Sequence, residues 1–272
     1  MCVLFLAYRV VPEFPFVFAM NRDELHARPT APASFWPVAA GLPENEILAG
    51  RDLEAGGTWM GVTRHGRFAA LSNFRDPKHQ KAHPRSRGEI VRDFLSQGVA
   101  PSEFLDSLQL RASEYNDFNF LCGVWGKAEE FRYYSSRARK QQLLEPGIYG
   151  LSNAYLDTPW PKVVRGKKAF ELLLQGLSGN PSREEWTKAL FAFLRNSHCA
   201  DDAELPDTGV GLAAERALSS IFIEPIRLSS GAYGTVSSSV ILFDSSGFAT
   251  FEERSLSLRP SRCVAHEFKI LS

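Results

Sequence analysis

The chain has 272 residues, of which 44% are hydrophobic and 23% charged, and its 31 basic side chains balance its 31 acidic ones. This composition is typical of a globular protein with a sizeable core, and it excludes a disordered or collagen-like chain. Because there is no basic excess, we expect neither nucleic-acid binding nor a polybasic attachment to anionic membranes.

The first elements in chain order are two apolar strands. Residues 2–10 and 14–20 are rich in Val and Phe and flank the segment Val11-Pro12-Glu13, which predicts an antiparallel hairpin. The apolar run over residues 1–8 is too short to span a bilayer, and no positive charge precedes it as in a signal peptide. We therefore expect no transmembrane segment and a cytoplasmic protein.

More hairpins are predicted further along the chain, followed by a last strand over residues 263–271. Each hairpin consists of two apolar runs around a polar turn: 59–62 with 68–71, 118–125 with 131–135, and 235–243 with 248–254.

Helices interrupt the hairpins in pairs. A capping-box pattern at Ser86-x-x-Glu89 predicts one helix and Pro101 begins the next; apolar spacing over 170–177 predicts a third, and Ser182-x-x-Glu185 caps a fourth. Because strands and helices do not alternate strictly, the pattern indicates an α+β protein with helices on the faces of antiparallel sheets. We expect a single domain over residues 1–272.

Cys2 is the most informative single residue. Met1 is usually removed ahead of a side chain this small, which would leave an α-amine of pKa about 7.7–8.0 beside a thiol of pKa about 8.5. One residue would then supply both nucleophile and base. The alternative, which position alone favours, is that Cys2 begins a buried strand. The other three cysteines are far apart and are expected to be small buried hydrophobes: Cys122, Cys199 and Cys263.

The polar run Asn21-Arg22-Asp23-Glu24 directly follows the second predicted strand. Such a run usually makes a solvated turn. If the first two strands pair through a short turn, however, the end of the second returns close to Cys2. Asp23 or Arg22 would then lie within reach of the α-amine, where a carboxylate orients the base.

Asparagines at other predicted strand ends are candidate oxyanion donors, because an amide N–H can stabilise a developing negative charge. Asn73 and Asn153 occupy such positions, although a single Asn is more often a turn or cap residue. His79 and His83 are four residues apart in a stretch rich in Lys and Pro, which indicates a solvated loop rather than a metal site.

These residues together resemble the NRDE family, also called the transport and Golgi organisation protein 2 family. The similarity begins with Met1-Cys2 and Asn21-Arg22-Asp23-Glu24 and continues in order along the chain. The further motifs that carry it are Gly50-Arg51-Asp52, Gly57-Thr58-Trp59-Met60-Gly61, Ser72-Asn73-Phe74-Arg75, Ser86-Arg87-Gly88, Gly150-Leu151-Ser152-Asn153, Thr158-Pro159-Trp160-Pro161-Lys162 and Tyr233-Gly234-Thr235.

The family is similar to N-terminal nucleophile (Ntn) hydrolases, which implies a four-layer αββα sandwich and no required cofactor. The resemblance implies that Cys2 is the nucleophile, that Asp23 supports its amine, and that Asn73 and Asn153 bind the oxyanion. Residues expected to bind substrate are Asn21, Arg22, Arg51 and Trp59. Where the family places an arginine after Tyr-Gly-Thr, this chain has Val236, so that Arg22 or Arg51 would have to supply the positive charge.

Two functions of different kinds follow. The first is hydrolysis of a non-peptide C–N bond of a small or lipid-like amide through a Cys2 acyl-enzyme. The alternative is a non-catalytic carrier of haem or of an acyl chain or acyl-CoA, as the family's links to haem trafficking and lipid metabolism imply. A carrier of this kind predicts a largely apolar cleft, and the 12% of aromatic residues would favour it.

Overall fold

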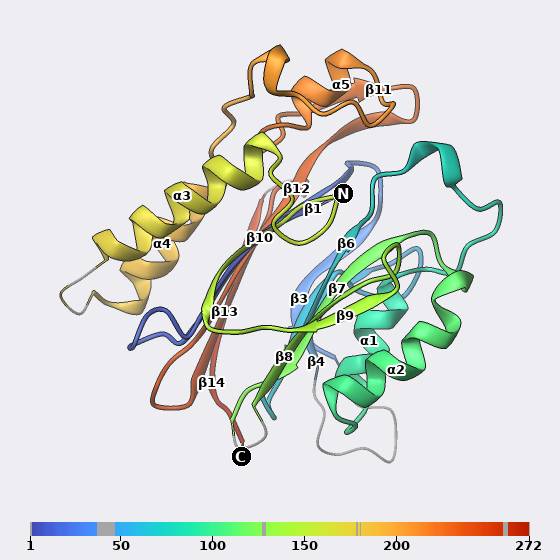
Figure 1. Cartoon of the computed structure of the whole chain (residues 1–272). Coiled ribbons are helices and arrows are strands. Elements are labelled where there is room, and N and C mark those ends of the chain that lie inside the picture. Colours follow the sequence, from blue (N-terminus) through green and yellow to red (C-terminus); the bar gives the residue numbers. More distant parts are fainter. Residues whose placement is uncertain are drawn as a thin grey trace.

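A computed structural model describes residues 2–36, 47–126, 129–177, 179, 181–257 and 261–271. Two seven-stranded antiparallel sheets face each other, and two long helices cover the outer face of each sheet (Figure 1). The α+β class and the four-layer αββα order are thereby confirmed. None of the helices in these ranges is long and apolar enough to cross a membrane.

The first sheet contains strands from both ends of the chain. Its strand order is β10-β1-β2-β12-β13-β14, with β11 paired to β12. The predicted N-terminal and C-terminal hairpins are both present as neighbouring pairs. The strands are β1 (Cys2–Tyr8), β2 (Phe16–Leu25), β10 (Gly147–Leu151), β11 (Ile226–Leu228), β12 (Gly231–Phe243), β13 (Phe248–Ser255) and β14 (Arg262–Lys269).

The second sheet runs in chain order from β3 to β9. It contains the two central hairpins that the sequence predicts and three strands that it does not, at the sheet's margins. The strands are β3 (Thr30–Phe35), β4 (Ile47–Asp52), β5 (Met60–Thr63), β6 (Arg67–Asn73), β7 (Phe118–Val124), β8 (Glu130–Ser135) and β9 (Lys140–Leu143).

The helices lie outside the sheets, as Figure 1 shows. Helices α1 (Gly88–Ser96) and α2 (Pro101–Arg111) pack on the second sheet, and α3 (Pro161–Gly176) and α4 (Arg183–Leu194) pack on the first. The short α5 (Leu212–Ala217) follows before β11. Single turns of 3-10 helix are formed by Pro77–His79, Ala112–Glu114 and Asp202–Glu204.

The two predicted capping boxes have different outcomes. Ser182 caps α4 reciprocally with Glu185, as predicted. The box predicted at Ser86 is wrong, because α1 has Arg87 as its N-cap and no side-chain cap. Its expected partner, Glu89, instead accepts a hydrogen bond from Tyr115 at 2.5 Å and pairs with an arginine.

Alternating side chains of β1 and β2 divide the core into layers. Phe16 and Phe18 point between the sheets, where both rings lie 4.9 Å from that of Phe68 on β6. Val3 and Phe5 point the other way, into the cluster beneath α3 and α4. This period-2 alternation determines which of the two layers each polar residue at the strand ends will face.

Two expectations about polar and cysteine positions are corrected. Residues 21–24 are not a turn after the second strand but lie within β2, where they pair with β12, and the first three are buried. Asn21 and Arg22 pair with both β1 and β12, so that their buried backbone polar groups have hydrogen-bond partners. Of the three remaining cysteines, Cys122 is buried as expected, whereas Cys199 is half-buried and Cys263 is exposed at the edge strand β14.

Candidate active site

The strand register brings the predicted nucleophile and carboxylate together. Cys2 on β1 lies opposite Arg22 on β2, so that Asp23 is the next residue along. On its other side β2 pairs with β12, which places Thr235 opposite Asp23. The prediction that the end of the second strand returns to Cys2 is confirmed.

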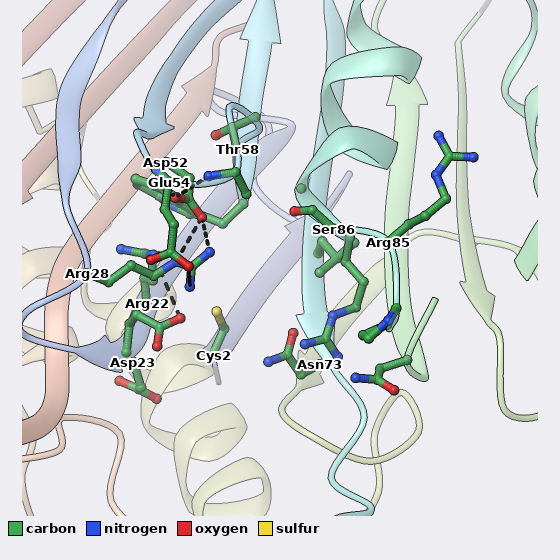
Figure 2. A pocket seen from close by; sticks show the side chains of 18 residues that line it. Cys2, Arg22, Asp23, Arg28, Asp52, Glu54, Thr58, Asn73, Arg85 and Ser86 are labelled. Atoms are coloured by element: carbon green, nitrogen blue, oxygen red, sulfur yellow. Dashed lines mark hydrogen bonds and ion pairs between the residues drawn. The ribbon is translucent and has the colours of Figure 1, made fainter. Parts of the chain in front are cut away.

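A pocket of about 470 Å³ opens at this end of the two sheets. In Figure 2 the sulfur of Cys2 points between two groups of side chains: those of Arg22, Asp23, Arg28 and Asp52 on one side, and those of Asn73 and Ser86 on the other. The lining is strongly polar, with four arginines and four carboxylates: Arg22, Arg28, Arg85 and Arg87, and Asp23, Glu24, Asp52 and Glu54.

Asp23 is a buried carboxylate held by neutral donors and nearby cations. The Thr235 hydroxyl donates to its Oδ1 at 2.8 Å, and the Tyr233 hydroxyl donates to its backbone oxygen at 3.2 Å. Burial raises the pKa of Asp23, while the Lys162 ammonium and the Thr235 hydrogen bond act against this rise. Burial likewise raises the pKa of the Cys2 thiol, against the effect of Arg22.

A second charged cluster lies behind Asp23, away from the pocket. Arg75 forms an ion pair with Glu215 at 2.8 Å, and both side chains are buried. The Nζ atom of Lys162, at the start of α3, is buried and has no hydrogen-bond partner among the described residues. Burial and the neighbouring Arg75 lower the pKa of Lys162 to about 8. Asp23 therefore lies between the pocket and a group of buried cations.

Of the four predicted substrate-binding residues, two line the pocket and two lie outside it. Arg22 and Trp59 line it and contact each other, with the guanidinium 4.3 Å from the ring centre. Arg51 lies outside the pocket and is exposed, with its guanidinium over the Trp36 ring. Asn21 also lies outside, because its amide faces the helix layer and donates to the backbone oxygens of Leu194 and Ile221.

The two candidate oxyanion donors differ in position. Asn73, at the end of β6, lines the pocket. Asn153 does not, and is fully buried. Its Nδ2 donates to the backbone oxygen of Asn73 at 3.1 Å, while its own backbone oxygen accepts from Arg75. Asn153 therefore holds the end of β6, and only Asn73 can reach a ligand in this pocket.

Several residues of the site were not assigned to it from the sequence, among them three that lie in motifs carrying the family resemblance. Arg87 lines the pocket, Lys162 lies behind Asp23, and Thr235 bonds to it. A local sequence signal exists for Lys162. Pro161 marks the first turn of α3, which positions Lys162 at a helix start. Thr235 lies in β12, and only its pairing with β2 reveals the contact.

The two histidines considered as metal ligands are both exposed. The Nδ1 atom of His79 lies 2.8 Å from the Asp76 carboxylate, within hydrogen-bond distance, and His83 lies in the same surface segment. Across the described part of the chain, no group of three or more His, Cys, Asp and Glu side chains has the arrangement of a metal site.

Comparison with known proteins extends this description. A family model described as Transport and Golgi organisation 2 matches residues 1–257. The Transport and Golgi organization protein 2 homolog of Bos taurus is 34% identical over 292 residues, with both chains covered completely. The Homo sapiens homolog is 33% identical over 270 residues, which cover 94% of this chain and 93% of the relative.

Solved structures share the architecture at low identity. A variant of the conjugated bile acid hydrolase from Clostridium perfringens aligns with a TM-score of 0.51 and 9% identity, covering 99% of this chain and 97% of that one. At this identity the likeness establishes the fold alone.

Proposed function

The chain belongs to the Transport and Golgi organisation 2 family and has an Ntn-hydrolase-like fold, and on this basis we propose that it hydrolyses a non-peptide amide through Cys2. The observation that carries the proposal is the position of Cys2. It lies at the start of β1, lines a pocket of about 470 Å³, and lies opposite Arg22, so that the buried Asp23 is one residue further along the paired strand.

The proposed reaction begins once Met1, which lies outside the described residues, has been removed. The free α-amine of Cys2 takes the thiol proton, and the thiolate attacks the amide carbonyl carbon. The resulting oxyanion collapses, the C–N bond breaks, and the leaving amine receives the proton from the α-ammonium. The α-amine of Cys2 then deprotonates a water molecule, which attacks the thioester. The C–S bond breaks, the carboxylic acid is released, and the Cys2 thiolate takes back the proton from the α-ammonium.

Two neighbours support particular steps of this proposal. Asp23 would hold the α-amine in position, as a buried carboxylate that itself accepts from Thr235. Asn73 lines the pocket beside Cys2 and would donate its amide N–H to the oxyanion. Loss of one such donor typically lowers the rate about 10²–10³-fold.

The alternative, carriage of haem or of an acyl chain or acyl-CoA, predicts a cleft with mostly apolar walls. The lining of this pocket has few apolar side chains, among them Trp59 and Leu71, and eight charged ones. This lining favours hydrolysis as the first proposal. Titration with haem and with acyl-CoA, followed by absorbance and melting temperature, would separate the two, since carriage requires a shift with one ligand.

The proposal is tested by mass and by reactivity. Intact mass should show a chain that begins at Cys2, and a panel of N-acyl amides should release amine. Cys2→Ala should abolish this release and the labelling by a thiol-directed amide probe. Cys122→Ala is the matched control, because Cys122 is also buried but packs beneath α1 and α2, away from the pocket. Retained Met1, or equal labelling of the Cys2→Ala variant, would contradict the proposal.

A further inference from the structure

Arg87 differs from the other arginines of the pocket in its partners. Within the described ranges its guanidinium donates one hydrogen bond, to the backbone oxygen of Asp117 at 3.1 Å, and forms no ion pair with a carboxylate. The remaining arginines of the lining each pair with an acid: Arg28 with Asp52 at 2.8 Å, Arg22 with Glu24 at 3.8 Å, and Arg85 with Glu114 at 2.6 Å.

Arg87 is also close to the nucleophile and partly removed from water. Burial lowers the pKa of Arg87, whereas the Cys2 thiolate, Glu24 and Asp117 act in the opposite direction. Both Arg87 and Cys2 line the same pocket. A guanidinium that is partly desolvated and lacks a counter-charge gains most from an anion that brings its own oxygens.

The local backbone also favours a negatively charged ligand. Helix α1 begins at Gly88, which also lines the pocket, so that the positive end of the helix dipole lies at this wall. No side chain caps this helix start, because Glu89 is engaged by Tyr115 and Arg85. This wall therefore combines a guanidinium that has no ion-pair partner among the described residues with an uncapped helix start.

From this geometry we infer that the pocket binds a substrate carboxylate at Arg87, so that the amides which enter it are acidic ones such as N-acyl amino acids. Arg87 forms no ion pair among the described residues although the acids and bases of the lining are equal in number, and the two oxygens of a carboxylate fit the parallel N–H groups of a guanidinium. This inference rests on the proposed function for the amide bond, but the carboxylate site itself does not require hydrolysis.

A pair of small alkylating reagents isolates the charge preference. Iodoacetate and iodoacetamide have the same size, and with either one the Cys2 thiolate forms an S–C bond while iodide leaves. Both reagents react with the thiolate, so that both rates depend in the same way on the pKa of the thiol. The ratio of the two rates is therefore independent of this pKa. Peptide mapping by mass spectrometry on the full chain gives this ratio separately at Cys2 and at the exposed Cys263, which serves as internal reference.

We expect the iodoacetate-to-iodoacetamide ratio at Cys2 to exceed that at Cys263 at least tenfold, and to fall as salt is raised. Arg87→Gln should remove this excess, while Arg87→Lys, which keeps the charge, should retain part of it. Arg92→Gln is the matched control, because Arg92 lies on α1 but is half-buried, is paired with Asp93 and does not line the pocket. Melting temperatures establish that each variant is folded.

Equal ratios at the two cysteines, an excess that survives in Arg87→Gln, or failure of both reagents to reach Cys2 would overturn the inference. These outcomes are distinct from a failure of the proposed function. A chain that prefers iodoacetate at Cys2 but hydrolyses no amide would retain the carboxylate site and lose only the reaction.

Discussion

Replacement of Lys162 by methionine makes a quantitative prediction about the buried charges behind the pocket. Lys162 is almost fully buried, its Nζ has no hydrogen-bond partner among the described residues, and burial lowers its pKa from 10.5 to about 8. In the unfolded chain this pKa returns to its ordinary value. Between pH 8 and 10.5 the unfolded chain therefore binds a proton that the folded chain has lost.

The sign follows from this difference in bound protons. Where the unfolded state holds more protons, the free energy of unfolding rises with pH. The lowered pKa of Lys162 thus costs stability below pH 8, and this cost is relieved as the pH rises through 10.5. For values of 8 and 10.5 the cost is about 3.4 kcal/mol at pH 7 and about 0.8 kcal/mol at pH 10, a change of about 2.5 kcal/mol.

Urea unfolding of the wild type and of Lys162→Met at pH 7, 8, 9 and 10 measures this change. From pH 7 to pH 10, the free energy of unfolding of the wild type should rise by about 2.5 kcal/mol relative to that of the variant. Taking the difference removes the contributions of tyrosines and cysteines that titrate in both chains. Lys168→Met, at an exposed position of the same helix, should stay parallel to the wild type. Parallel curves for Lys162→Met would refute the reasoning.

Further predictions concern the strand pair, the pocket wall and the helix starts. Thr235→Val removes the hydroxyl that donates to Asp23 and should slow the proposed hydrolysis about tenfold in initial-rate assays, whereas Thr235→Ser should not. Gly50→Ala places a Cβ 2.6 Å from the pocket's tryptophan ring and should cost ~1–3 kcal/mol in urea unfolding, while Gly98→Ala, with no atom within 4 Å, should cost little. Ser182→Ala should destabilise the chain by about 1 kcal/mol, because the N-cap of α4 is lost. Ser86→Ala removes no cap and should change the free energy of unfolding by less than ~0.5 kcal/mol. An equal loss of stability in both variants would contradict the structure.

Much of the fold could be predicted because its hairpins are apolar runs around short polar turns. The strands that were missed lack this signal. β9 consists of Lys140–Leu143 with three polar residues, and β10, Gly147–Leu151, contains two glycines. Both lie at sheet margins, where backbone pairing with one neighbour replaces the alternation of buried and exposed side chains. No local pattern distinguishes such strands from loops.

The site was predictable to the extent that it follows from one hairpin. Pairing of β1 with β2 is local, so that Cys2 and Asp23 could be brought together from the sequence. Arg87 and Lys162 enter from separate helix starts, and their positions depend on how both helix layers pack on the sheets. Contacts of this kind, between residues far apart in the chain, leave no trace in spacing or composition.

The alternation along β2 explains why the two halves of the site face different surroundings. Arg22 shares its side of the strand with Phe18 and Met20, which point between the sheets, and it reaches Trp59 there. Asp23 shares its side with Val17 and Ala19, which point toward the helices. The pocket is therefore the open end of the layer between the sheets, and Asp23 lies between it and two buried cations, Lys162 at the start of α3 and Arg75 just after β6. Lys162 interacts electrostatically with both Asp23 and Cys2, so that a change of its charge should reach the site without altering the residues that line the pocket.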